Sequence, residues 1–144
     1  MDGSVGRAVY VLSKQNTEGE KMYELLMIDH VCLIVRDVLK SKEYYEMIFD
    51  VKGRPHPRDD KTYMFESPGI HFFLIQADCP RDFLEKQHLS IRTNNLEMAK
   101  KVLEDKGITQ FEIGCFQDFI YTNYKWLEWR DPDGIRLEFA EVIK

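Results

Sequence analysis

The run Ile28-Asp29-His30-Val31-Cys32-Leu33 has a counterpart in the second half of the chain, Lys86-Gln87-His88-Leu89-Ser90-Ile91. In each run a histidine opens an apolar, strand-like stretch, and a helix-like stretch follows. A second pair of similar runs ends each half, Gly69-Ile70-His71-Phe72-Phe73-Leu74 and Gly134-Ile135-Arg136-Leu137-Glu138-Phe139. The chain therefore contains an internal repeat, which predicts two similar modules.

Both halves follow one order of predicted elements. The first half predicts a buried strand over 26–35, a helix over 37–49 with Asp37 as its N-cap, and strands over 61–66 and 70–77. The second half predicts a strand over 87–93, a helix over 96–106, and strands over 111–116, 124–130 and 135–142. Pro55 and Pro57 break the chain where the first half needs one more strand, and residues 79–82 read as the linker. Strand, helix and three strands, twice over, predict an α+β fold.

Composition narrows the class of protein. The chain has 144 residues, of which 44% are hydrophobic and 31% are charged, as in an ordinary globular domain. A formal net charge of −5 disfavours binding to nucleic acid or to an anionic membrane, and no apolar run is long enough to span a bilayer. Cys32, Cys79 and Cys115 lack the spacing of a disulfide framework, which indicates reduced thiols and a cytoplasmic protein.

The first residues differ from the rest of the chain. Residues 1–24 are rich in glycine and small polar side chains, so we expect a flexible N-terminal tail or leader. The functional domain is then expected over 25–144, with module one over 26–78 and module two over 86–142.

Three residues are candidate metal ligands: His30, His88 and Glu138. The repeat places the two imidazoles at equivalent positions, and Glu138 lies in the last apolar run, where an unpaired carboxylate is costly to bury. Two histidines and one carboxylate suit divalent Fe, Mn, Zn, Ni or Co, and they leave positions for water and a bidentate substrate. Either histidine alone is more simply a core residue, and Glu138 could face solvent; their coincidence in the repeat favours a metal site.

Further residues are candidates for the pocket around such a metal. The substrate pocket is expected to include Tyr63, Phe65, Phe73, Trp126 and Cys32, although strand alternation cannot turn every one of these side chains inward. Candidate catalytic residues are Glu128, as a general base, and His71 and Tyr124. Phe73 occupies the repeat position equivalent to Glu138, so module one offers no carboxylate there.

These motifs resemble the vicinal oxygen chelate superfamily, which includes glyoxalase I, fosfomycin-resistance proteins, extradiol dioxygenases and bleomycin-resistance proteins. The resemblance covers about 27–142, and its most specific part is Trp129-Arg130-Asp131-Pro132-Asp133-Gly134 followed by Glu138. It implies two βαβββ modules that form a cup-shaped mixed β-sheet with helices outside. It also implies that His30, His88 and Glu138 hold the metal and that the chain forms a homodimer, with ligands from one chain or from two.

The resemblance leaves the activity open between classes. A metal-dependent lyase, isomerase, transferase or dioxygenase would bind a small substrate through adjacent oxygens and stabilise an oxyanion or enolate. Phe73 replaces the additional glutamate of glyoxalase I, which argues against that activity. The alternatives are a metal-free protein that sequesters a drug or metabolite, as bleomycin-resistance proteins do, and a regulatory domain whose ligand residues are relics.

Overall fold

The computed structural model describes residues 22–117 and 122–144, so most of the expected tail lies outside the described residues. Module one contains β1 (Val31–Val35), α2 (Val38–Phe49), β2 (Gly53–His56), β3 (Asp59–Ser67) and β4 (Ile70–Gln76). A one-turn helix, α3 (Arg81–Leu84), follows. Module two contains β5 (His88–Arg92), α4 (Leu96–Asp105), β6 (Glu112–Phe116), β7 (Tyr124–Arg130) and β8 (Arg136–Val142).

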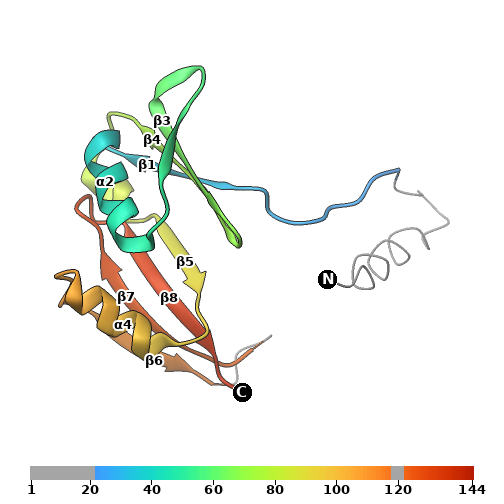
Figure 1. The fold of residues 1–144 in the computed structure, drawn as a ribbon, viewed down its shortest axis with the longest axis vertical. Coiled ribbons are helices and arrows are strands. Elements are labelled where there is room, and N and C mark those ends of the chain that lie inside the picture. The colour runs from blue at the N-terminus through green and yellow to red at the C-terminus, as the bar shows by residue number, and fades with distance from the viewer. Residues whose placement is uncertain (1–21, 118–121) are drawn as a thin grey trace.

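The two modules have the same topology. Each forms a four-stranded mixed sheet, in the order β1-β4-β3-β2 for module one and β5-β8-β7-β6 for module two. The first and last strands of each module pair in parallel, and the remaining pairs are antiparallel. The predicted α+β fold of two βαβββ units is therefore confirmed. Figure 1 shows α2 and α4 on the same side of the molecule, and no helix of the described residues covers the other face of either sheet, here called the open face.

Local sequence explains where the helices begin and end. Asp37 caps α2, because its side chain accepts hydrogen bonds from the backbone N–H groups of Leu39 and Lys40, and Asn95 caps α4 in the same way through Met98. Gly107 follows α4 with a φ of 90°, a left-handed conformation that glycine adopts without strain. The cap at Asp37 agrees with the sequence prediction.

Three predicted elements differ in the structure. The strand predicted over 26–35 is shorter, because β1 pairs with β4 from Val31 opposite Phe72 and β4 itself begins only at Ile70. The preceding apolar residues consequently lie outside the sheet, and Ile28 is 78% exposed. A strand does form at Pro55, since β2 is an edge strand and an edge tolerates a residue without an N–H donor. The one-turn helix α3 begins within the predicted linker and extends beyond it to Leu84, which is completely buried.

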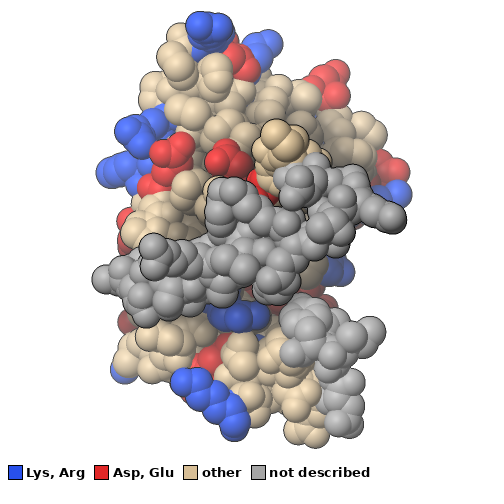
Figure 2. All heavy atoms as spheres, turned by 90° about the vertical axis from the view of Figure 1, so that its right-hand side faces the viewer, with Lys and Arg blue, Asp and Glu red and all other residues tan. Residues whose placement is uncertain are grey.

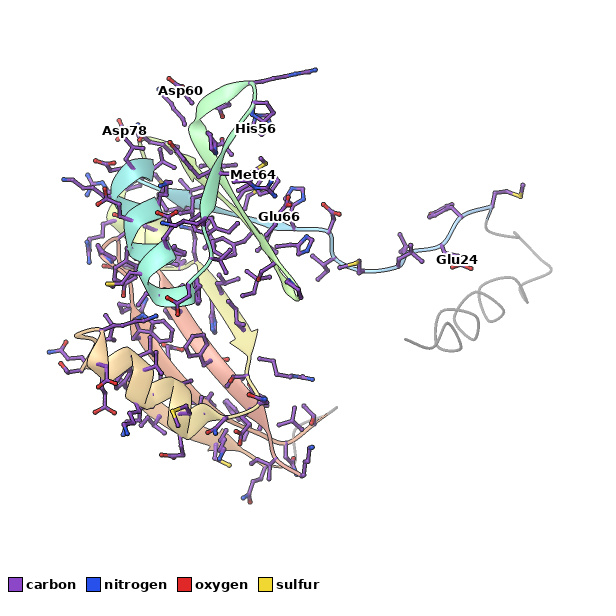
Figure 3. The ribbon with its side chains drawn as sticks, in the orientation of Figure 1. Glu24, His56, Asp60, Met64, Glu66 and Asp78 are labelled. Atoms are coloured by element: carbon purple, nitrogen blue, oxygen red, sulfur yellow. The ribbon has the colours of Figure 1, made fainter. Side chains whose placement is uncertain are left out.

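A single core lies between the helices and the sheets of both modules. In module one, Tyr45 of α2 is fully buried against Phe65 and Phe72, whose rings stack with their centroids 4.8 Å apart. In module two, Leu127, Trp129, Ile135 and Leu137 continue the same hydrophobic cluster. Side chains that alternate with these residues along each strand point to the open face. Figure 3 shows this for Met64 and Glu66 of β3, which point away from α2.

Polar side chains fix one module against the other. The Gln87 side-chain amide donates to the carbonyl oxygen of Ile34 and accepts from its N–H, both at 2.7 Å. Tyr45 Oη donates to Asp131 Oδ2 at 2.8 Å, and Trp129 Nε1 donates to Tyr44 Oη at 3.1 Å. These bonds bridge residues far apart in the chain, so they specify how the modules dock.

The Asp131-Pro132-Asp133-Gly134 turn holds Asp131, which accepts the hydrogen bond from Tyr45 of module one. Asp131 Oδ1 accepts from the backbone N–H groups of Asp133 at 2.8 Å and Ile135 at 2.9 Å, which folds the turn around the buried carboxylate. Gly134 has a φ of 87°, where a side chain would be strained. Burial, as the largest cause, raises the pKa of Asp131, and the hydrogen bonds from Tyr45 and Ile135 oppose that rise.

Candidate metal centre

Four functional side chains share the open face of the module-two sheet. In the parallel pairing of β5 with β8, His88 lies opposite Arg136 and Ser90 lies opposite Glu138. In the antiparallel pairing of β7 with β8, Glu128 lies opposite Glu138. Directly opposed residues point to the same face of a sheet, so the backbone register alone brings two carboxylates, an imidazole and a guanidinium together.

The geometry of this group suits a cation. His88, Glu128 and Glu138 each offer one ligand atom, and these atoms lie within 4.8 Å of one another. His88 Nε2 is 3.7 Å from Glu138 Oε2. Ser90 Oγ donates to the other carboxylate oxygen, Glu138 Oε1, at 2.6 Å. Glu138 is 9% exposed, so its carboxylate is held between a hydroxyl and an imidazole with little access to water.

Arg136 is the fourth member of the group and contacts two of the others. Its Nη2 is 2.6 Å from His88 Nδ1, and its Nε is 3.5 Å from Glu128 Oε1. This Nε is buried and has no hydrogen-bond partner among the described residues, so the contact with Glu128 is an ion pair of imperfect geometry. Arg136 was not predicted to contact the site, although strand alternation puts it on the face of Glu138.

A hollow of about 410 Å³ opens beside these residues. Its walls include His88, Ser90, Arg92, Tyr124 and Glu138. Of the candidate catalytic residues, Tyr124 therefore lines this hollow, and Glu128 lies within the charged group. Trp126 lies on the same face, opposite Ala140, and packs against Gly114, where an added Cβ would overlap its indole ring.

The structure places His30 in the other module. It immediately precedes β1, stacks on Phe73 with ring centroids 4.1 Å apart, and pairs through Nδ1 with Asp29 Oδ2 at 2.8 Å. That hydrogen bond is the largest cause of a lowered pKa of Asp29. Within the described residues His30 does not belong to the cluster of His88, Glu128 and Glu138, so one chain in this conformation brings together two of the three predicted ligands.

The other predicted pocket residues separate into two groups. Cys32 and Phe73 are register partners on the open face of module one, and His71 of β4 lies opposite Glu66. Tyr63 and Phe65 are on the opposite face: Phe65 is 0% exposed, and the Tyr63 ring lies under Lys42 of α2. The prediction that Phe65 lines the pocket is therefore wrong, because the α2 helix covers that face of β3.

The surface around the open faces has mixed charge. Figure 2 views the molecule from the side opposite the helices, and Lys, Arg, Asp and Glu side chains are interspersed over the described surface visible there. Among the described residues, no helix has both the length and the apolar character needed to traverse a bilayer.

Comparisons with known proteins add independent evidence. No family model matches the chain. A "Probable trivalent organoarsenical cleaving enzyme" of Bacillus subtilis (strain 168) is 30% identical over 114 residues, which cover 76% of each chain. Among solved structures, a glyoxylase/bleomycin resistance protein/dioxygenase domain from Frankia sp. EAN1pec is 28% identical with a TM-score of 0.61, and the match covers 83% of this chain and all of that one.

A more distant structure shares the fold. The fosfomycin resistance protein FosX from Listeria monocytogenes, complexed with Mn(II) and sulfate, has a TM-score of 0.58 at 15% identity, over 82% of this chain and 91% of that one. Three observations point to the same family. They are the two βαβββ modules, the sequence similarity to the Bacillus protein and the folds shared with these solved structures. The chain belongs to the vicinal oxygen chelate superfamily.

Proposed function

We propose that this chain is a divalent-metal-dependent enzyme whose metal is held by His30, His88 and Glu138. The observation that carries the proposal is the approach of His88 Nε2 to Glu138 Oε2, 3.7 Å apart on neighbouring strands at the edge of a hollow. Imidazole nitrogen and carboxylate oxygen are donors that Fe, Mn, Zn, Ni and Co ions accept. The donor set on the open face thus fits the group that the fold implies.

Hydrogen bonds from neighbouring residues support the same assignment. Metal-binding histidines commonly donate their second ring N–H to a carboxylate, which fixes the ring and its tautomer. Asp29 is such a partner for His30 Nδ1, and it leaves His30 Nε2 available for a metal. Ser90 similarly occupies one oxygen of Glu138 and leaves Oε2 on the side of His88.

We further propose that His30 reaches the site from a second copy of the chain. His30 lies in module one, outside the cluster that contains His88 and Glu138. The Phe73 ring on which His30 stacks lies on the module-one face away from α2, and His88 and Glu138 lie on the corresponding face of module two, so these two faces could meet between copies. A two-fold homodimer that joins module one of one copy to module two of the other would bring the three ligands together twice.

The residues of the chain have distinct roles in this proposal. A bound metal supplies Lewis acidity, which stabilises negative charge on the oxygens of a small substrate. The hollow beside His88 and Glu138 holds that substrate, and Tyr124 contributes to its wall. Glu128 is placed to take a proton from the substrate, because its carboxylate lies within the same group of side chains.

Metal analysis tests the ligand assignment. Protein purified without chelator is measured by mass spectrometry, and we expect about one divalent transition metal per chain. His88→Ala and Glu138→Gln should each abolish it, whereas His56→Ala, which removes an imidazole from the β2–β3 turn, should not. A wild-type protein that binds none of the five ions, even after soaking in excess, would contradict the proposal.

Complementation tests the two-chain site. His30→Ala and His88→Ala are expected to bind no metal separately. After unfolding and refolding together, mixed dimers contain one site with all three ligands, so metal binding returns in part. If both variants stay metal-free in the mixture although a tagged copy pulls down an untagged one, the ligands come from a single chain.

Trivalent organoarsenicals are the first substrates to test, since the Bacillus relative is named for cleaving them. Trivalent arsenic is a soft centre that favours thiolates. Both thiols are exposed, but Cys32 lies on the open face beside Phe73, whereas Cys115 pairs in register with Lys125 on the opposite face of the module-two sheet. Release of inorganic arsenic by the metal-loaded protein, absent in Glu138→Gln, would assign this substrate. Loss of the reaction in Cys32→Ser but not in Cys115→Ser would assign the thiol.

One observation favours a second candidate, a metal-free protein that binds a small molecule. Arg136 already places a positive charge among His88 and Glu128, so the cluster has a counter-charge without a metal. In that case ligand affinity would be indifferent to chelator and to His88→Ala. The metal analysis above separates the two functions.

A further inference from the structure

Arg136 and the candidate ligands form an arrangement that a metal would have to disturb. The guanidinium group carries only donors and is always protonated, so a contact from its Nη2 to a ring nitrogen requires that nitrogen to accept. At 2.6 Å from Arg136 Nη2, His88 Nδ1 is therefore the acceptor, and the ring proton lies on Nε2. His88 Nε2 lies 3.7 Å from Glu138 Oε2.

That tautomer is the wrong one for binding a metal on the Glu138 side. A metal at Nε2 needs the lone pair there and therefore moves the ring proton to Nδ1. An N–H at Nδ1 would then face the Nη2 donor of Arg136 with nothing to accept it. His30 shows the opposite arrangement within the same chain, because an acceptor, Asp29 Oδ2, lies at its Nδ1.

Arg136 balances part of the negative charge of the two glutamates in the cluster. Glu128 and Glu138 lie directly opposite each other on β7 and β8, and like charges in that position repel. Arg136 offsets this repulsion through its ion pair with Glu128 at 3.5 Å. Its hold is incomplete, since the buried Nε has no hydrogen bond and the side chain remains 38% exposed. A side chain held in this way can turn outward at small cost.

We propose that Arg136 is an internal counter-cation that occupies the His88–Glu128–Glu138 cluster until a metal displaces it, and that it thereby lowers the metal affinity of this chain. This inference rests on the proposed metal site and adds to it a residue that sets affinity without being a ligand. Metal binding then includes three coupled events: Arg136 leaves His88 Nδ1, the ring proton moves to Nδ1, and Nε2 binds the ion.

The inference is tested by zinc affinity in substituted proteins. Zn(II) binding is measured by competition with a chromogenic chelator for wild type, Arg136→Leu and Arg136→Gln. Removing a unit positive charge a few ångströms from a dication should tighten binding roughly tenfold. Arg136→Gln should bind zinc more tightly than Arg136→Leu, because the amide oxygen of the glutamine can accept a hydrogen bond from the new N–H at His88 Nδ1. Arg92→Leu is the matched control: it removes the same charge from the wall of the hollow, four residues along β5 from His88, and should change affinity by less than about twofold.

A second measurement reads the tautomer directly and needs no metal. Long-range 1H–15N correlation spectra of histidine-labelled, metal-free protein, assigned with His88→Gln, should show His88 protonated at Nε2. In metal-free Arg136→Gln the proton should shift toward Nδ1. A wild-type His88 protonated at Nδ1 would overturn the inference, whatever the zinc affinities.

The outcomes also separate this inference from the proposed function. Zinc affinities that are equal in wild type and both Arg136 variants, or weaker in the variants, would overturn the role of Arg136 and leave the metal site standing. Zinc binding by the Arg136 variants alone would support the role of Arg136, and it would count against zinc as the metal of the wild type. Failure of the wild type and of both Arg136 variants to bind any of the five ions would refute both.

Discussion

Replacement of Tyr45 by phenylalanine should weaken the docking of the two modules without leaving a cavity. Tyr45 Oη donates to Asp131 Oδ2 at 2.8 Å, and this is the only hydrogen bond that Oδ2 accepts among the described residues. The ring itself is 0% exposed and keeps its contacts in the variant. The change therefore removes one polar contact from a buried carboxyl group that is 5% exposed.

The size of the effect follows from the charge on the acceptor. A hydrogen bond to a charged group contributes about 1.5–3 kcal/mol, so the free energy of unfolding should fall by about 2 kcal/mol. For a domain of this length the melting temperature should fall by roughly 4–8 °C. The loss of unfolding free energy caused by Tyr45→Phe should become smaller at acidic pH. Burial raises the folded-state pKa of Asp131 above its unfolded value, so its carboxyl group becomes neutral as the pH falls through that raised pKa, and a neutral carboxyl group needs the donor less.

Urea unfolding, followed by circular dichroism, measures the change. Tyr23→Phe is the control, since Tyr23 is 64% exposed and its substitution should be neutral. A double-mutant cycle with Asp131→Asn isolates the pair. A loss below about 0.5 kcal/mol for Tyr45→Phe, or an equal loss in the presence and absence of the Asp131 carboxylate, would refute the reasoning.

Three other predictions concern packing, pH and the connection between modules. Gly114→Ala should destabilise the protein by about 1–3 kcal/mol in urea and shift its tryptophan fluorescence, because the new Cβ overlaps the Trp126 indole; an unchanged spectrum would contradict this. Burial raises the pKa of Tyr44 to about 12, above its unfolded value near 10, so its contribution to stability is complete below the unfolded value and is lost as the pH rises toward about 12. The urea midpoint should therefore fall between about pH 10 and about pH 12, less steeply in Tyr44→Phe, and equal slopes would argue against this assignment. Gln87→Leu should cost about 1–3 kcal/mol, because the N–H and carbonyl groups of Ile34 both lose their partner, and hydrogen exchange at Ile34 should accelerate; unchanged exchange would count against that role.

Much of the fold could be predicted from the sequence, because it depends on local patterns. The internal repeat, the cap at Asp37, and the Asp131–Gly134 turn each specify an element within a few residues. The length of β1 could not be predicted in this way. The apolar run before Val31 looks like a strand, but β4 provides no partner for it.

The site was predictable in part for the same reason. Alternation places Arg136 on the face of Glu138, and the repeat places His30 and His88 at equivalent positions. Which residues lie opposite one another depends on register, and register emerges only when strands pair. The contacts of Arg136 with His88 and of Ser90 with Glu138 are therefore properties of the β5–β8 pairing. The burial of Phe65 depends likewise on α2, which covers the other face of β3.

The amide of Gln87 has a consequence for how this protein could transmit motion. Gln87 immediately precedes His88, so the two hydrogen bonds that hold the β1 edge lie one peptide unit from a candidate ligand. Module one cannot slide along module two without either dragging the backbone of His88 or breaking both bonds. The relative position of the two modules and the orientation of the His88 imidazole are therefore coupled, so that a change in one changes the other. A substrate, a partner chain or a mutation that shifts β1 would therefore change the orientation of the His88 ring, even if it contacts no residue of the hollow.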